Sequence, residues 1–100
     1  MKLIVLMSLA DYKNQVRQLF EKHNIHVYSE VEIIGHTADT VKHYGWWSFE
    51  KDLPMYSIMY FAVIPANKAE EIFSEVKKLA KELDSKHPPR AFQIDVEKMV

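Results

Sequence analysis

The chain has 100 residues, of which 48% are hydrophobic and 27% charged, which is the size and composition of one compact domain. It contains no cysteine, so disulfides, thiolate catalysis and cysteine-ligated zinc or iron–sulfur sites are excluded. Its 13 Lys and Arg against 14 Asp and Glu give a net charge of −1, which argues against a nucleic-acid-binding surface. The opening run Leu3–Met7 is too short for a membrane span or a signal peptide, so we expect a cytoplasmic domain without membrane insertion.

The first quarter of the chain predicts a strand followed by a helix. The aliphatic run Lys2–Met7 is typical of a central strand. Asp11 can accept hydrogen bonds from the free N–H groups at a helix start, and Asn24 is a common left-handed residue at a helix end. Between them, three apolar residues recur at helical spacing: Val16, Leu19 and Phe20.

Two further strands are expected in the middle of the chain. Apolar and acidic residues alternate over Val27–Ile34, which predicts a strand with one buried face. The run Tyr56–Ile64 predicts another strand, closed by Pro65. From 35 to 54 periodicity is absent and Gly, Asp and Pro punctuate the sequence, so we expect a long connection there.

The last third predicts a second helix and a final strand. Asn67 and Glu70 have the spacing of a capping box at the start of an apolar 3.6-residue pattern. In the final strand Phe92, Ile94 and Val96 alternate with polar residues. The order β-α-β-β-α-β predicts a single α+β domain over 1–100, a ferredoxin-like sandwich with a four-stranded antiparallel sheet and both helices on one face.

This architecture leaves one sheet face without helices, yet the central strands carry large apolar residues in both directions. Met59, Tyr60 and Phe61 are consecutive, so an alternating strand must turn at least one of them away from the helices. Exposed apolar area costs about 25 cal/mol per Å². We therefore expect the bare face to be buried in a homo-oligomer.

The connection between the second and third strands is the second unusual feature. A hairpin needs about 2–5 residues there, and connections as long as this one are usually functional. Three of its aromatic residues are candidates for docking on a partner protein, because Trp and Tyr are enriched in interface hot spots: Tyr44, Trp46 and Trp47. The alternative for Trp46 and Trp47 is that they pack on their own or a neighbouring subunit and seal an effector site.

Four short segments resemble the nitrogen regulatory PII-like signalling family. The resemblance covers the opening strand before the Asp11-led helix, the second strand running into the long connection, the end of the third strand, and the final strand. In order, these segments are Met1–Val5, Ser29–Val31 with Gly35, Val63–Pro65 and Phe92–Glu97. The segment 36–55 then corresponds to the family's T-loop.

The resemblance implies a trimer with inward-facing sheets, a small effector in clefts between subunits, and control of a transporter or enzyme through the T-loop. Carried over by position, the ligand-binding residues are Gly35, His36, Thr37, Ile64 and Arg90. Classical members wrap nucleotide phosphates with a glycine-rich segment. Here that position, Asp84–Arg90, has no glycine and contains two prolines without N–H donors, so classical ATP or ADP binding is not expected.

The start of the long connection carries candidate metal ligands: His36, Asp39 and His43. Imidazole and carboxylate suit zinc, copper, nickel or cobalt, and a loop can gather two or three such groups. Solvated loop side chains are the alternative. The sequence also resembles a branch of the family linked to metal transport, which implies a metal-ion effector and a membrane transporter or efflux component as partner.

Two other readings remain open. Ferredoxin-like dimers also serve as small monooxygenases and isomerases, in which His43 would act as acid or base and Tyr56 or Tyr60 as proton donor. No nucleophile–base pair or carboxylate dyad supports this, and a non-enzymatic protein is expected. An interaction module without any effector is the third reading.

Overall fold

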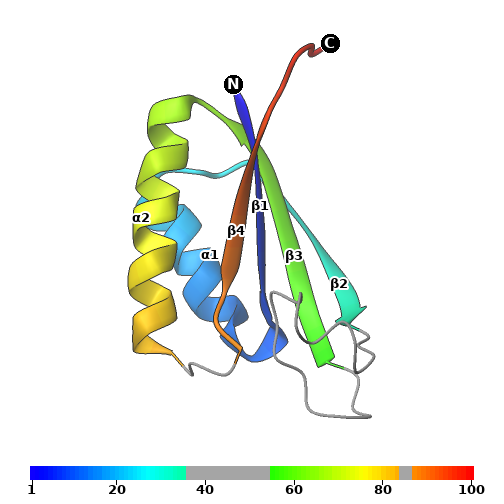
Figure 1. The fold of residues 1–100 in the computed structure, drawn as a ribbon, viewed down its shortest axis with the longest axis vertical. Helices are drawn as coiled ribbons and strands as arrows, with labels where there is room; N and C mark the ends of the chain where they lie inside the picture. Colours follow the sequence, from blue (N-terminus) through cyan, green and yellow to red (C-terminus); the bar gives the residue numbers. More distant parts are fainter. Residues whose placement is uncertain (36–54, 84–86) are drawn as a thin grey trace, which may run out of the picture.

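The computed structural model describes residues 1–35, 55–83 and 87–100 (Figure 1). A 3-10 turn, η1, precedes the first helix, and the elements follow the expected order: β1 (Lys2–Leu9), η1 (Ala10–Tyr12), α1 (Lys13–Lys22), β2 (Ser29–Gly35), β3 (Met55–Ile64), α2 (Ala66–Glu82) and β4 (Arg90–Asp95).

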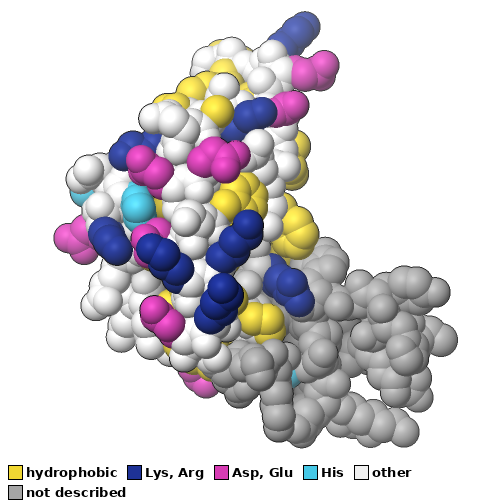
Figure 2. All heavy atoms as spheres, turned by 60° about the vertical axis from the view of Figure 1, so that its left-hand side comes forward, with side chains coloured by type: hydrophobic (Ala, Val, Ile, Leu, Met, Phe, Trp, Pro, Cys, Tyr) yellow, Lys and Arg dark blue, Asp and Glu magenta, His cyan; other side chains and the backbone are white. Residues whose placement is uncertain are grey.

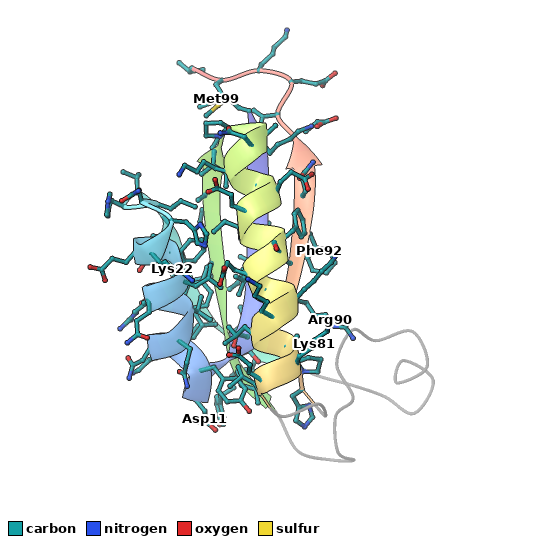
Figure 3. All side chains as sticks on the ribbon, turned by 90° about the vertical axis from the view of Figure 1, so that its left-hand side faces the viewer. Asp11, Lys22, Lys81, Arg90, Phe92 and Met99 are labelled. Carbon is teal, nitrogen blue, oxygen red and sulfur yellow. The ribbon has the colours of Figure 1, made fainter. Side chains whose placement is uncertain are left out.

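The four strands form one antiparallel sheet in the order β2-β3-β1-β4, and both helices lie on the same face of it (Figure 1). Figure 3 shows α2 in front of the sheet with α1 beside it; Asp11 precedes α1 and Lys22 ends it. This confirms the predicted α+β ferredoxin-like fold and the long connection between the second and third strands.

The hydrophobic core lies between the sheet and the helix layer. Alternate residues of the central strands point into it: Leu6 of β1 lies directly opposite Tyr60 of β3, and both are fully buried. The helices contribute the apolar stripes that their 3.6-residue spacing predicts, with Phe20 from α1 and Ile72 from α2 fully buried. Burial of such side chains stabilises the fold by about 1.5–3 kcal/mol each.

The start of α1 differs from the prediction. β1 continues to Leu9, and the chain then turns through η1, so that α1 begins at Lys13 with Tyr12 as its N-cap. Asp11 lies inside η1, and neither helix start has a side-chain cap hydrogen bond. Because β1 extends to Leu9 and η1 follows it, Tyr12 takes the N-cap position of α1 in place of Asp11, so the predicted cap is wrong.

The end of α1 confirms the predicted role of Asn24, whose φ is 59°. The Asn24 N–H donates to the Glu21 carbonyl at 3.0 Å, and the Ile25 N–H donates to the Phe20 carbonyl at 2.9 Å. These two bonds form a Schellman motif, which satisfies carbonyls that the helix end would otherwise leave free. Phe20 and Ile25, which the motif joins, both lie in the core.

The start of α2 also corrects the prediction. Pro65 is the N-cap, with φ −62° and ψ 154°, and no side-chain cap hydrogen bond is present. Its carbonyl accepts the Ala69 N–H at 3.0 Å. Because Pro65 has a fixed φ and lacks an N–H, the helix begins directly after it. Asn67 and Glu70 therefore lie within the first turns and do not form the predicted capping box.

The second strand begins at Ser29, two residues later than expected. Its register with β3 runs from Ser29 opposite Phe61 to Gly35 opposite Met55. Residues 25–28 must carry the chain from the end of α1 to the edge of the sheet. Ile25 is buried at the start of this crossing, whereas Val27 lies outside the strand with 88% of its surface exposed.

The outer surface of the helix layer is charged. Figure 2 shows Lys, Arg, Asp and Glu side chains interspersed over it. His23 at the end of α1 reaches α2, with Nδ1 3.3 Å from Glu71 Oε2 and Nε2 3.7 Å from Glu75 Oε1. Burial raises the pKa of the Glu75 carboxyl, but the ammonium groups of Lys22 and Lys78 outweigh the effect of burial and lower that pKa overall.

None of the helices in the described ranges is long and apolar enough to cross a membrane.

The opposite face of the sheet carries a continuous apolar surface that no described helix covers (Figure 1). We call it the open face. Strand register places on it side chains from all four strands, and four of them are more than one-third exposed: Val31, Phe61, Val63 and Ile94. Contiguous exposed apolar side chains are typical of interaction surfaces, so the open face is a candidate interface.

Candidate functional site

The candidate site lies where β2 ends and β3 begins, at the base of the connection 36–54. Gly35 and Met55 are the last paired residues of these strands. On the helix side of the sheet, Ile34 lies directly opposite Tyr56, and Glu32 lies opposite Ile58. η1 follows β1 at this end of the sheet, since Leu9 lies opposite Ser57.

A cavity of about 430 Å³ occupies this corner, within the size range of small-molecule sites. Among the described residues, its lining comes from η1, β2 and β3: Ala10, Glu32, Ile33, Ile34, Tyr56 and Ser57. Tyr56 is 66% exposed and Ile34 is 54% exposed, although both belong to the sheet face that carries the helices. Among the described elements, neither helix covers these two side chains at this end of the face.

The charged group among the described lining residues of the cavity is Glu32, which lies on the side of β2 that faces the helices. Glu30, two residues before Glu32, receives hydrogen bonds from Arg17 of α1, including one from Nε to Oε2 at 3.2 Å. The hydrogen bond from Arg17 lowers the pKa of the Glu30 carboxyl, and the same bond raises the pKa of Arg17. No ion pair or hydrogen bond joins Glu32 to any residue in the described ranges. Among the described residues, Glu32 is therefore the charged group at the cavity that has no cationic partner.

An aromatic cluster lies further inside, between α1 and the sheet. Phe20 stacks on Tyr28 with ring centroids 4.6 Å apart, and Tyr60 lies 6.0 Å from Phe20 and 6.4 Å from Tyr28. Burial, assisted by the charge of Glu30, raises the pKa of the Tyr60 hydroxyl to about 12. That side chain is fully buried, so the suggestion of Tyr60 as proton donor to a substrate finds no support, whereas Tyr56 is accessible.

The predicted ligand-binding residues are spread over the sheet. Gly35 ends β2, and Arg90 begins β4 at the opposite edge (Figure 3), where it pairs with Met7. Ile64 lies at the other end of β3, opposite Lys2, and is only 5% exposed. A single copy of the chain therefore does not bring Gly35, Ile64 and Arg90 together. His36 and Thr37 lie outside the described residues.

The predicted metal and partner residues also lie outside the described part of the chain: His36, Asp39, His43, Tyr44, Trp46 and Trp47. Within the described ranges, no group of three or more His, Asp and Glu side chains is arranged to hold a metal ion.

Sequence reasoning did not single out Glu32 or Ile34, and it named Tyr56 only as a proton donor in the enzymatic alternative. The alternation over β2 was assigned to one buried and one solvated face. The available signal was the position of Ile34 and Tyr56 on the two sides of the long connection, where antiparallel strands bring the flanking residues opposite each other.

The chain is similar to known proteins in its fold and shows little similarity to them in its sequence. No protein-family model and no curated protein sequence matches the chain. Among solved structures, it is similar to CPII, a nitrogen regulatory PII-like protein from Thiomonas intermedia K12 that was determined with ADP, AMP and bicarbonate bound. The match covers 99% of this chain and 94% of that chain, with a TM-score of 0.62 and 15% sequence identity. The chain therefore has the fold of a PII-like regulatory protein along almost its whole length.

Proposed function

We propose that this chain is a PII-like regulatory protein that acts in the cytoplasm as a homotrimer. It binds a small effector at the base of the long connection and controls a partner protein through residues 36–55. The observation that carries the proposal is the likeness to a PII-like protein over 99% of the chain and 94% of the neighbour. The apolar open face and the long β2–β3 connection are consistent with it.

The open face is the proposed trimer interface, and its exposed aliphatic and aromatic side chains support this. Phe61→Glu places a charge at its centre, and burying an unpaired charge is costly, so we expect monomers. Val27→Glu is the matched control, because Val27 is an exposed apolar residue outside the sheet. Light scattering coupled to size-exclusion chromatography distinguishes the states. A monomeric wild-type chain at micromolar concentration would contradict the trimer, and a dimer would favour the enzymatic reading.

The effector site is proposed to lie between subunits and to involve Gly35, His36, Thr37, Ile64 and Arg90. Because Ile64 lies far from Gly35 within one chain, the proposed site combines Gly35 of one subunit with Ile64 of another. The similar solved structure, CPII, was determined with ADP, AMP and bicarbonate bound. Pro88 and Pro89 precede Arg90 here and offer no N–H donors to phosphate, so the proposed effector differs from a nucleoside diphosphate.

A transition-metal ion is the proposed effector on the chemistry of His36, Asp39 and His43. Calorimetric titration with zinc and copper(II) tests it, with the double variant His36→Ala/His43→Ala expected to lose binding. His26→Ala is the control, because His26 is an exposed histidine of the described chain. Unchanged affinity in the double variant would remove the metal from the proposal while leaving the regulatory function in place.

The proposed partner surface comprises Tyr44, Trp46 and Trp47, and the partner is a membrane transporter or efflux component. Regulation requires that the effector binds one state of the segment better than the other. Both tryptophans of the chain lie in this segment, so tryptophan fluorescence reports on it directly. We expect effector binding to change the emission, and an unchanged spectrum at saturating effector would contradict the switching mechanism.

A further inference from the structure

The cavity beside β2 and β3 has a chemistry that the fold comparison does not assign. Its described walls are apolar except for the Glu32 carboxylate and the polar groups of Tyr56 and Ser57. Tyr56 presents an exposed aromatic ring, and Ile34 opposite it presents an exposed aliphatic surface. The cavity thus combines a large hydrophobic contact area with one ionisable group, which is the usual make-up of a small-molecule site.

The sign of the charge follows from the pairing along β2. Glu30 is neutralised by the hydrogen-bonded guanidinium of Arg17, and Glu32 has no cationic partner in the described ranges. No Lys, Arg or His is among the described lining residues of the cavity. A bound anion would meet an uncompensated carboxylate, whereas a bound cation would meet a complementary charge and the negative face of the Tyr56 ring.

We propose that this cavity binds a small organic cation, an alkylammonium whose charge faces Glu32 and whose apolar body packs against Ile34 and Tyr56. The alkylammonium would be a second ligand beside the proposed metal ion, and its regulatory role rests on the proposed function because the cavity adjoins the long connection. The proposed cation differs in charge from the ligands of the CPII structure, which are ADP, AMP and bicarbonate.

The test compares choline with its neutral isostere 3,3-dimethylbutan-1-ol, which has the same shape without the charge. Both are titrated into the intact chain while the amide signals of Ala10, Ile33 and Ser57 are followed by NMR. We expect choline to bind about tenfold more tightly than the alcohol, because an exposed ion pair and a cation–π contact each contribute a factor of about 2–5.

Three conservative variants resolve the contributions. Glu32→Gln should weaken choline binding about threefold and leave the alcohol unchanged. Tyr56→Phe should keep the affinity because it keeps the ring, whereas Tyr56→Leu should weaken choline binding about threefold. Glu70→Gln is the control, because it removes an exposed carboxylate from α2 that does not line the cavity.

Equal affinity of the wild-type chain for choline and the alcohol would overturn the proposal, as would choline-induced shifts confined to residues outside the cavity. Stronger shifts of the same amides with bicarbonate or AMP would also overturn it. Light scattering on the same samples distinguishes failure of the cation site from failure of the proposed function. Choline binding by a monomeric chain would support the cation site and contradict the PII-like trimer. A trimer that does not bind choline would contradict the cation site alone.

Discussion

Tyr60 is the largest fully buried side chain among the described residues. Its side chain is fully buried, and its hydroxyl has no hydrogen-bond partner among the residues that the structure describes. A buried hydroxyl without a partner costs about 1–3 kcal/mol relative to its hydrated state. The aromatic contacts with Phe20 and Tyr28 offset this cost, so the ring stabilises the core and the oxygen does not.

The first prediction is that Tyr60→Phe raises the free energy of unfolding by about 1 kcal/mol, because it removes the unpaired hydroxyl and keeps the ring. Urea denaturation followed by circular dichroism measures the change. Tyr28→Phe, at the half-buried ring stacked on Phe20, is the matched control and should change stability less. A loss of stability in Tyr60→Phe would mean that an ordered water or another group bonds the hydroxyl.

The second prediction concerns alkaline pH. The pKa of Tyr60 is raised from 10.0 to about 12 in the folded state. A group whose pKa is raised on folding contributes stability that is present below its unfolded pKa and is lost as the pH rises through the folded value. The free energy of unfolding should therefore fall between about pH 10 and 12, and this decrease should be smaller in Tyr60→Phe. Equal pH dependence of the two proteins would contradict the assignment.

At the scale of secondary-structure elements, the end of α1 depends on one residue in the left-handed region. Asn24 tolerates φ 59° better than residues with larger or branched side chains, and glycine tolerates it best. Asn24→Gly should therefore keep or slightly raise stability, whereas Asn24→Ala should lower it by about 1 kcal/mol. Thermal unfolding of both variants measures the difference. Equal melting temperatures would show that the Schellman motif does not need this conformation.

The stability that the ion pair between Arg17 of α1 and Glu30 of β2 contributes should decrease at acidic pH. The hydrogen bond from Arg17 lowers the pKa of Glu30 below its ordinary value of 4.5, so its contribution is present at neutral pH and lost as the pH falls through the lowered value. Glu30→Gln should therefore be less stable than the wild-type chain at pH 7 and closer to it below pH 3. Both groups are partly exposed, so the effect should be small. A difference that stays constant with pH would contradict it.

At the scale of the whole molecule, the open face couples stability to association. If folded copies bury this face against one another, mass action stabilises the folded state, and the melting temperature must rise with protein concentration. We expect such a rise for the wild-type chain and its loss in Phe61→Glu, measured by scanning calorimetry from 5 to about 200 µM. A melting temperature independent of concentration in both proteins would indicate a stable monomer.

Local patterns predicted the elements better than their ends. The strands, helices and left-handed Asn24 follow from alternation, helical spacing and residue type, which act over a few neighbours. The starts of α1 and α2 did not follow from local sequence. β1 extends to Leu9, so that Asp11 lies in η1, and Pro65 takes the N-cap position of α2 that was expected for Asn67. How far a strand extends depends on its pairing within the sheet. At the base of the connection, the sequence analysis named Gly35 as a ligand-binding residue and Tyr56 as a possible proton donor, whereas it did not name Glu32 or Ile34.

The fold class, the amphipathic faces and the long connection follow from the order of amino acids alone, because hydrophobic periodicity and breaker residues are local properties. The exposure of Ile34 and Tyr56, the absence of a cationic partner for Glu32 among the described residues, and the distance between Ile64 and Gly35 are evident only in the folded chain. All three depend on strand register and on where the helix layer ends, and these are set by packing between segments that are distant along the chain.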